Sequence, residues 1–76
     1  MKKPRTLAQL KTDPRVKDWS DERTGWCNDG IWLYLQEGWI APSTGLGTVH
    51  EMTVAECCEA LHESYFDMDE YKSVHR

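Results

Sequence analysis

One run of hydrophobic residues dominates the chain: Ile-Trp-Leu-Tyr-Leu at positions 31–35, between Asp29-Gly30 and Glu37-Gly38. A short apolar run with turn residues on both sides is typical of a buried strand. The period of two places residues 31, 33 and 35 on one face of this strand and Trp32 and Tyr34 on the other. Because the chain has few other apolar clusters, we expect both faces of this central strand to be buried.

Two capping-box patterns predict where helices begin. The first starts at Thr6 and predicts a short helix from Leu7 to about Thr12, which ends before Pro14 because the residue preceding a proline disfavours helical geometry.

The second capping box starts at Thr53 and predicts a helix from Val54 to about Asp67. Met52 and Cys57 are placed to pack on each other as a hydrophobic staple at its start. The apolar face of this helix holds six residues: Val54, Cys57, Cys58, Leu61, Tyr65 and Met68.

Two further strands flank the central one. Residues 15–23 predict a first strand, in which the spacing of three between Val16 and Trp19 requires a bulge or a late start near Lys17. Residues 24–30 end in Asn-Asp-Gly and predict the hairpin loop into the central strand. Residues 48–51 predict a short edge strand after an exposed loop at 41–47.

These elements predict an α+β fold, a small antiparallel sheet of three strands with two helices in the order α-β-β-β-α. The 76 residues form a single domain, with a flexible basic tail at 1–5 and a frayed end at 69–76. A chain of this length has a small core, so most of its eight aromatic residues are expected inside it.

The net charge of -4 conceals a strong asymmetry. Residues 1–18 hold six basic and two acidic side chains, a net charge of +4, whereas residues 19–76 hold three basic and eleven acidic ones, a net charge of -8. An acidic body with a basic leader argues against nucleic-acid binding by the main surface and favours a basic partner.

Acidic side chains line the second predicted helix opposite its apolar face: Glu56, Glu59, Glu63 and Asp67. Between Glu51 and Glu70 the chain has seven acids and no lysine or arginine. At about 1.5 Å per residue these four charges span about 16 Å, roughly one charge per 4 Å, close to the roughly one per 3.4 Å along one DNA strand. An anionic binding surface and an ordinary solvated face both fit this pattern.

Other candidate sites are weaker. Cys58 and His62 stand four residues apart and could share a metal with Cys57, Cys27 or His50, but a cysteine on an apolar helix face is usually a core residue. His50-Glu51 beside Ser43 and Thr44 lies in no recognised nucleophile motif. We therefore predict no cofactor, no metal and no enzymatic activity.

The chain contains no pattern of a secretory or membrane protein. No apolar stretch follows the basic start Met-Lys-Lys-Pro-Arg, no run approaches a membrane span, and the three cysteines are an odd set. These features predict a soluble protein of the reducing cytoplasm.

Two stretches of the chain resemble a pattern found in small bacteriophage and mobile-element proteins. They are Asp-Gly-Ile-Trp-Leu-Tyr-Leu-Gln-Glu-Gly-Trp at 29–39 and Thr-Val-His-Glu at 48–51, ahead of Thr53. The resemblance covers about residues 14–62, and its motif is structural. Small acidic proteins of this origin are similar in character to anti-CRISPR proteins, several of which imitate DNA and block a CRISPR effector complex.

The leading hypothesis is therefore a non-enzymatic inhibitor that binds a basic, nucleic-acid-binding surface of a bacterial host complex, as an anti-CRISPR protein against a type I effector would. The alternatives are a phage regulatory or packaging protein that places its basic leader on nucleic acid, and a metal-stabilised enzyme fragment. We expect a monomer or weak dimer. The predicted partner-binding residues are Glu56, Glu59, Glu63, Asp67, Glu70, Trp26 and Trp39.

Overall fold

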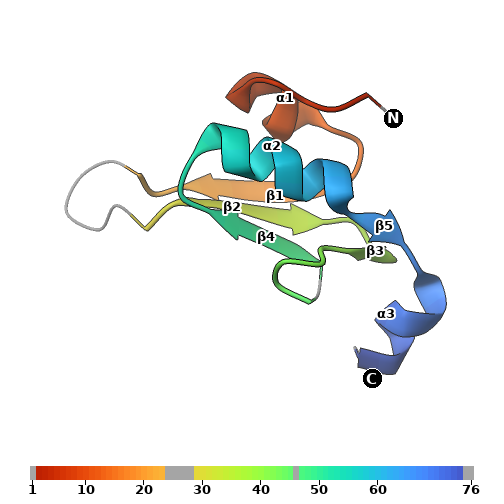
Figure 1. The fold of residues 1–76 in the computed structure, drawn as a ribbon. Coiled ribbons are helices and arrows are strands. Elements are labelled where there is room, and N and C mark those ends of the chain that lie inside the picture. Colours follow the sequence, from red (N-terminus) through yellow and green to blue (C-terminus); the bar gives the residue numbers. More distant parts are fainter. Residues whose placement is uncertain (1, 24–28, 46, 75–76) are drawn as a thin grey trace.

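A three-stranded antiparallel sheet with two helices on one face forms the body of the protein (Figure 1). This computed structural model describes residues 2–23, 29–45 and 47–74. The predicted α+β class is confirmed. In chain order the elements are α1 (Leu7–Thr12), β1 (Val16–Asp21), β2 (Ile31–Leu35), β3 (Trp39–Ile40), β4 (Thr48–Glu51), α2 (Val54–Glu63), β5 (Tyr65–Phe66) and α3 (Met68–Val74).

β2 is the central strand of the main sheet, as predicted, with strand order β1-β2-β4 and antiparallel pairing on both sides. Leu33 lies opposite Trp19 of β1 and Val49 of β4. The register of β1 shifts between Val16 and Asp18, so the bulge predicted near Lys17 is confirmed. Residues 24–28 of the predicted hairpin loop lie outside the described residues.

The core fills the space between the sheet and the two helices. β2 contributes all three residues of one face, and α2 contributes two adjacent pairs, Cys57-Cys58 and Ala60-Leu61, spaced three positions apart, as a helix with one apolar face requires. The buried cluster consists of Leu10, Val16, Ile31, Leu33, Leu35, Ala41, Val49, Cys57, Cys58, Ala60 and Leu61.

The expectation that both faces of β2 are buried is wrong. Trp32 is half-buried and Tyr34 is 37% exposed, because α1 and α2 both pack on the opposite face of the sheet (Figure 1). When both helices pack on the same face of a sheet, the core forms only between that face and the helices, and the other face of the sheet is in contact with solvent. The aromatic pair of β2 is therefore a surface feature.

The predicted helix from Val54 to about Asp67 ends earlier, at Glu63. Ser64 adopts an extended conformation, and its amide and hydroxyl both donate hydrogen bonds to the carbonyl of Leu61. The next residues form β5, which pairs with β3 in a second, two-stranded sheet. Residues 68–74, expected to be frayed over most of this range, form α3.

Gly38 makes the second sheet possible. Its φ of +93° is unfavourable for other residues, and a Cβ atom there would lie 2.4 Å from Cε2 of Phe66. The amide of Asp67 also donates to the carbonyl of Gly38 at 2.8 Å. The turn before β3 can therefore pack against β5, because Gly38 has no side chain that would overlap Phe66.

The helix caps agree in part with the sequence. The capping box at Thr6 is complete. At Thr53 only half of it forms, because the Glu56 carboxylate accepts a hydrogen bond from the Thr53 hydroxyl instead of the Thr53 amide. The predicted staple is not formed, since Met52 is 47% exposed beside Gly30.

In the described ranges, no helix has the length and hydrophobicity that crossing a membrane requires.

Candidate functional site

An open groove with acidic walls runs between α2 and the end of β4. Its volume is about 350 Å³, and it is lined by four glutamates and three small residues: Glu51, Glu56, Glu59, Glu63, Ser43, Ala55 and Ala60. We call these residues the acidic groove. The small side chains form recesses between the carboxylates, so a long side chain from a partner can lie among them.

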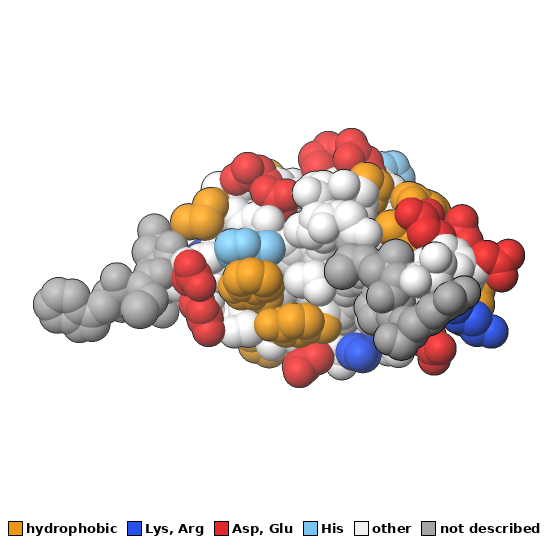
Figure 2. Space-filling view, turned by 90° about the horizontal axis from the view of Figure 1, so that it is seen from below, with side chains coloured by type: hydrophobic (Ala, Val, Ile, Leu, Met, Phe, Trp, Pro, Cys, Tyr) orange, Lys and Arg blue, Asp and Glu red, His pale blue; other side chains and the backbone are white. Residues whose placement is uncertain are grey.

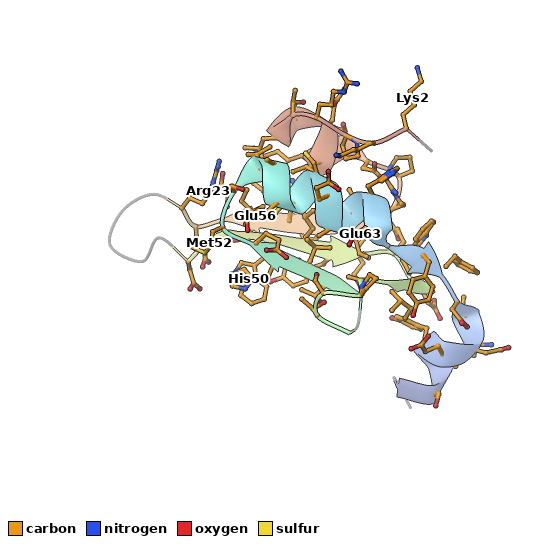
Figure 3. All side chains as sticks on the ribbon, in the orientation of Figure 1. Lys2, Arg23, His50, Met52, Glu56 and Glu63 are labelled. Atoms are coloured by element: carbon orange, nitrogen blue, oxygen red, sulfur yellow. The ribbon has the colours of Figure 1, made fainter. Side chains whose placement is uncertain are left out.

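Two elements position the carboxylates of the acidic groove. Glu56 and Glu63 are seven residues apart, so they lie on the same side of α2, about 10 Å apart along its axis. Both project from the helix, which covers one face of the sheet (Figure 3). Glu51 ends β4 and pairs with Ile31, so it lies on the helix side of the sheet as well. The groove therefore gathers negative charge from α2 and from the sheet.

Glu59 already binds a lysine of the same chain. Lys3 donates a hydrogen bond and forms an ion pair with the Glu59 carboxylate, and this pairing lowers the pKa of Glu59. Both side chains are substantially exposed, and exposed pairs of this kind contribute little to stability. The pairing shows that an ammonium group fits beside α2.

Two of the predicted acidic partner residues do not join the acidic groove. Asp67 lies between β5 and α3, where its carboxylate accepts the amide of Glu70. Glu70 accepts the hydroxyl of Tyr65, which raises the pKa of Tyr65. The evenly spaced stripe expected along one helix is therefore wrong beyond Glu63, because α2 ends there.

Of the two predicted aromatic anchors, Trp39 does not line the acidic groove. Trp39 is half-buried and packs against the core, with the ring of Phe66 edge-on at 5.9 Å between centroids. Trp26 lies outside the described residues.

A basic surface lies on the leader. Lys2, Lys3, Arg5 and Gln9 line an open depression of about 460 Å³. Arg15, counted with the leader in the sequence, belongs to the interior instead, because it is 4% exposed and forms an ion pair with Asp13. The charge asymmetry of the sequence is thus also a spatial one, with the basic leader next to the acidic groove and the ion pair of Lys3 with Glu59 at their boundary.

The cysteines and histidines form no reactive cluster in the parts of the chain described. Cys57 and Cys58 are free and buried in the core, as predicted for structural cysteines, and Cys27 lies outside the described residues. Burial raises the pKa of Cys57 to about 11 and also raises that of Cys58, so neither thiol is a nucleophile near neutral pH. No group of three or more potential ligands in the described residues is arranged to hold a metal.

His50 and Ser43, the weak candidates for a base and a nucleophile in the sequence, do not come together in the structure. Ser43 lines the acidic groove, on the helix side of β4, whereas His50 points to the other face of the sheet (Figure 3). There its ring stacks on Trp32 at 3.7 Å between centroids, and its Nε2 atom contacts the carbonyl oxygen of Asp29.

Sequence reasoning missed a row of aromatic rings on this second face. Trp32 lies between His50 and Tyr34. The ring centroids of Trp32 and Tyr34 are 6.5 Å apart, and the plane of the Trp32 ring is within 11° of parallel to the planes of both neighbouring rings. We call these three side chains the aromatic row. The pairing of residues 32 and 50 could have been found by aligning the two strands outward from the buried pair Leu33 and Val49.

No known protein family, curated protein or solved structure matches this chain. The resemblance to small bacteriophage and mobile-element proteins therefore remains a prediction. The acidic groove and the aromatic row are the observations from which a function can be argued.

Proposed function

We propose that this protein is a non-enzymatic interaction protein that binds a basic, nucleic-acid-binding surface of another protein through the acidic groove. The observation that carries the proposal is the convergence of four glutamates from α2 and β4 on one groove. Charged side chains on a helix surface are ordinary, but most of them alternate in sign with their neighbours. Here the lining holds carboxylates and small residues, so its natural complement is a run of lysines or arginines.

The geometry of the acidic groove supports the binding of long side chains such as those of lysine and arginine. Lysine and arginine have aliphatic stems that pack on alanine while the charged head reaches a carboxylate. Ala55 and Ala60 supply such contacts, and Glu56 and Glu63 lie at the two ends. Electrostatic complementarity of this kind acts mainly on association rate and specificity.

The spacing of the carboxylates is compatible with imitation of nucleic acid. Glu56, Glu59 and Glu63 place three carboxylates along about 10 Å of helix, roughly 5 Å apart, against roughly 3.4 Å along a DNA strand, and Lys3 pairs with the middle one. A protein that binds phosphates would therefore meet a similar, sparser charge array. Inhibition of a CRISPR effector complex in a bacterial host cell is the specific role of this kind that the sequence predicts.

A second candidate function has an observation of its own. The depression lined by Lys2, Lys3 and Arg5 could accept a phosphate group, as expected of a regulatory or nucleic-acid-associated accessory protein. Salt-sensitive retention of the protein on duplex DNA, lost when these three residues are changed to glutamine, would favour this second function.

The proposed function is tested by capture from a bacterial lysate, followed by competition with duplex DNA. Wild-type protein should retain a DNA-binding protein that DNA displaces, and Glu56→Lys/Glu63→Lys protein should not retain it. The control is Glu37→Lys/Asp69→Lys, which changes two exposed acids elsewhere and should still retain the partner. Equal capture by the groove variant and the wild type would refute the proposal.

A further inference from the structure

The sheet face opposite the helices carries an ordered set of exposed and half-buried side chains. The strand register places Asp18 and Ser20 of β1, Tyr34 and Trp32 of β2, and Thr48 and His50 of β4 side by side in two rows. Glu22 continues this face beyond β1, since its amide pairs with the carbonyl of Gly30 and its carboxylate accepts the Ser20 hydroxyl. We call this the outer face.

Figure 2 shows the outer face directly, with hydrophobic side chains next to a histidine and acidic side chains near both ends. The aromatic row crosses its centre, flanked by Asp18 beside Tyr34 and by Glu22 beyond Ser20. One exposed lysine, Lys17, lies in the bulge next to Asp18. The centre of the outer face is thus aromatic, and among the described residues named here two carboxylates outnumber one lysine.

The fold itself shows what such rings bind in this protein. The ammonium group of Lys11 lies 3.9 Å from the ring centroid of Trp19, and the guanidinium of Arg15 lies 5.9 Å from that of Trp39. Trp32 stacks on His50 instead, so one face of its indole is already covered, and the ring of Tyr34 lies nearly parallel to it at 6.5 Å between centroids. A cation over an aromatic ring is stabilised by the negative potential of the ring face, and arginine uses this interaction more often than lysine.

We propose that the outer face is a second binding site, in which Tyr34 and the part of Trp32 that His50 leaves uncovered stack arginine side chains of a basic polypeptide segment, and Asp18 and Glu22 pair with their charge. The planar guanidinium group matches the rings, and each carboxylate can accept two of its N–H groups. This site goes beyond the proposed function, because it lies on the opposite face of the sheet and stands even if the acidic groove binds nothing.

The charge of the outer face selects among possible occupants. Bases of single-stranded nucleic acid also stack on exposed rings of a sheet, but their phosphates are normally held by surrounding lysines and arginines. Here Asp18 and Glu22 would repel phosphates. A second copy of the chain would likewise bring two sets of these carboxylates together, so a basic polypeptide fits this face best.

The experiment compares an arginine nonapeptide with a lysine nonapeptide, which have the same charge and length. Fluorescence anisotropy of the labelled peptides gives both affinities. Wild-type protein should bind the arginine peptide about fivefold more tightly than the lysine peptide. Trp32→Thr/Tyr34→Thr should reduce this preference to less than about twofold and leave the lysine peptide's affinity nearly unchanged, because lysine binding depends mainly on charge.

Two control variants separate this site from other effects. Tyr65→Thr removes a tyrosine of similar exposure, 41% against 37%, from β5 and should keep the preference for arginine. Glu56→Lys/Glu63→Lys should weaken both peptides equally and also keep the preference, so failure of the acidic groove and failure of the aromatic row give different results. Wild-type protein without a preference, or an unchanged preference in Trp32→Thr/Tyr34→Thr, would overturn the proposal.

A second measurement covers the case in which the double variant does not fold. In wild-type protein, nuclear magnetic resonance should show that the arginine peptide shifts the indole N–H signal of Trp32 more than that of Trp39. Equal shifts, or no shift at Trp32, would refute the site. Binding of a thymidine oligonucleotide, or dimerisation, that shifts Trp32 when the arginine peptide does not would assign the face to that occupant instead.

Discussion

At the scale of single residues, Arg15 joins three parts of the fold through one guanidinium group. Its Nε and Nη2 atoms donate to the two carboxylate oxygens of Asp13 at 2.9 Å, and its Nη1 atom donates to the carbonyl of Leu61 at 3.1 Å. The group also lies over Trp39. A cation at the last turn of α2 interacts favourably with the carbonyl end of that helix, so Arg15 ties the α1–β1 turn to α2.

We predict that Asp13→Asn destabilises the protein by about 3 kcal/mol, because it leaves the buried Arg15 without its counter-ion. Urea unfolding followed by circular dichroism measures this change. Asp21→Asn is the matched control: Asp21 and Arg23 form the same fork two residues apart, but both side chains are more exposed. Its effect should be clearly smaller, and equal effects in the two variants would contradict the role of burial.

The same pair predicts a dependence on pH. Hydrogen bonds from Arg15 hold the pKa of Asp13 below its usual value of 3.8, so the ionised carboxylate stabilises the folded state. This contribution is complete above the unfolded pKa and is lost as pH falls through the folded one. The free energy of unfolding should therefore decrease below about pH 4 in wild-type protein and decrease less in Asp13→Asn. Parallel pH profiles of the two proteins would contradict this account.

The burial of Arg15 could not be predicted from the sequence. Its neighbours Lys11 and Lys17 belong to a basic leader, and a charge run of this kind is normally solvated. The groups that bury it, Trp39 and the carbonyl of Leu61, come from distant parts of the chain. A local pattern contains no information about such contacts.

At the scale of elements, the sequence predicts the helices and strands that have a clear hydrophobic period or a capping motif. The central strand, the bulge in β1, the edge strand β4 and the starts of α1 and α2 all follow from local patterns. β3 and β5 have two residues each, too few to show a period, and they form because Gly38 admits Phe66. α2 ends at Glu63 with Ser64 as its extended cap, and the chain then enters β5.

The same limit applies to the candidate site. Glu56, Glu59 and Glu63 could be placed on one helix face from their spacing, but Glu51 and Ser43 join them only through the packing of α2 beside β4. The exposure of Trp32 and Tyr34 depends on which face of the sheet the helices cover. Hydrophobicity alone favours burial for both, and the number of covering layers is a property of the whole fold.

For α2 we predict that Thr53→Ala costs about 1 kcal/mol, because the amide of Glu56 loses the hydroxyl that caps it at 3.1 Å. Thr53→Ser keeps this hydroxyl and should stay within a few tenths of a kcal/mol of wild type. Chemical denaturation of the three proteins measures both differences. Equal stability of Thr53→Ala and wild type would mean that the cap contributes nothing.

At the scale of the whole molecule, the protein presents three surfaces of different character. The leader is basic, the acidic groove lies between α2 and β4, and the aromatic outer face lies on the far side of the sheet. The main sheet, β2 at its centre, separates the last two. Substitutions on the outer face should leave the other two surfaces and the core unchanged, whereas the leader and the acidic groove are coupled by the ion pair of Lys3 with Glu59.

The central claim is that the acidic groove, and not net charge alone, binds a basic partner. The direct test is calorimetric titration with the lysine nonapeptide at about 50 to 500 mM salt. Glu56→Lys/Glu63→Lys and Glu37→Lys/Asp69→Lys each replace two negative charges by two positive ones and bring the net charge of -4 to zero. We predict that the groove variant loses about tenfold in affinity and the control about threefold or less, with wild-type binding weakening as salt rises. Equal losses in the two variants would contradict the claim.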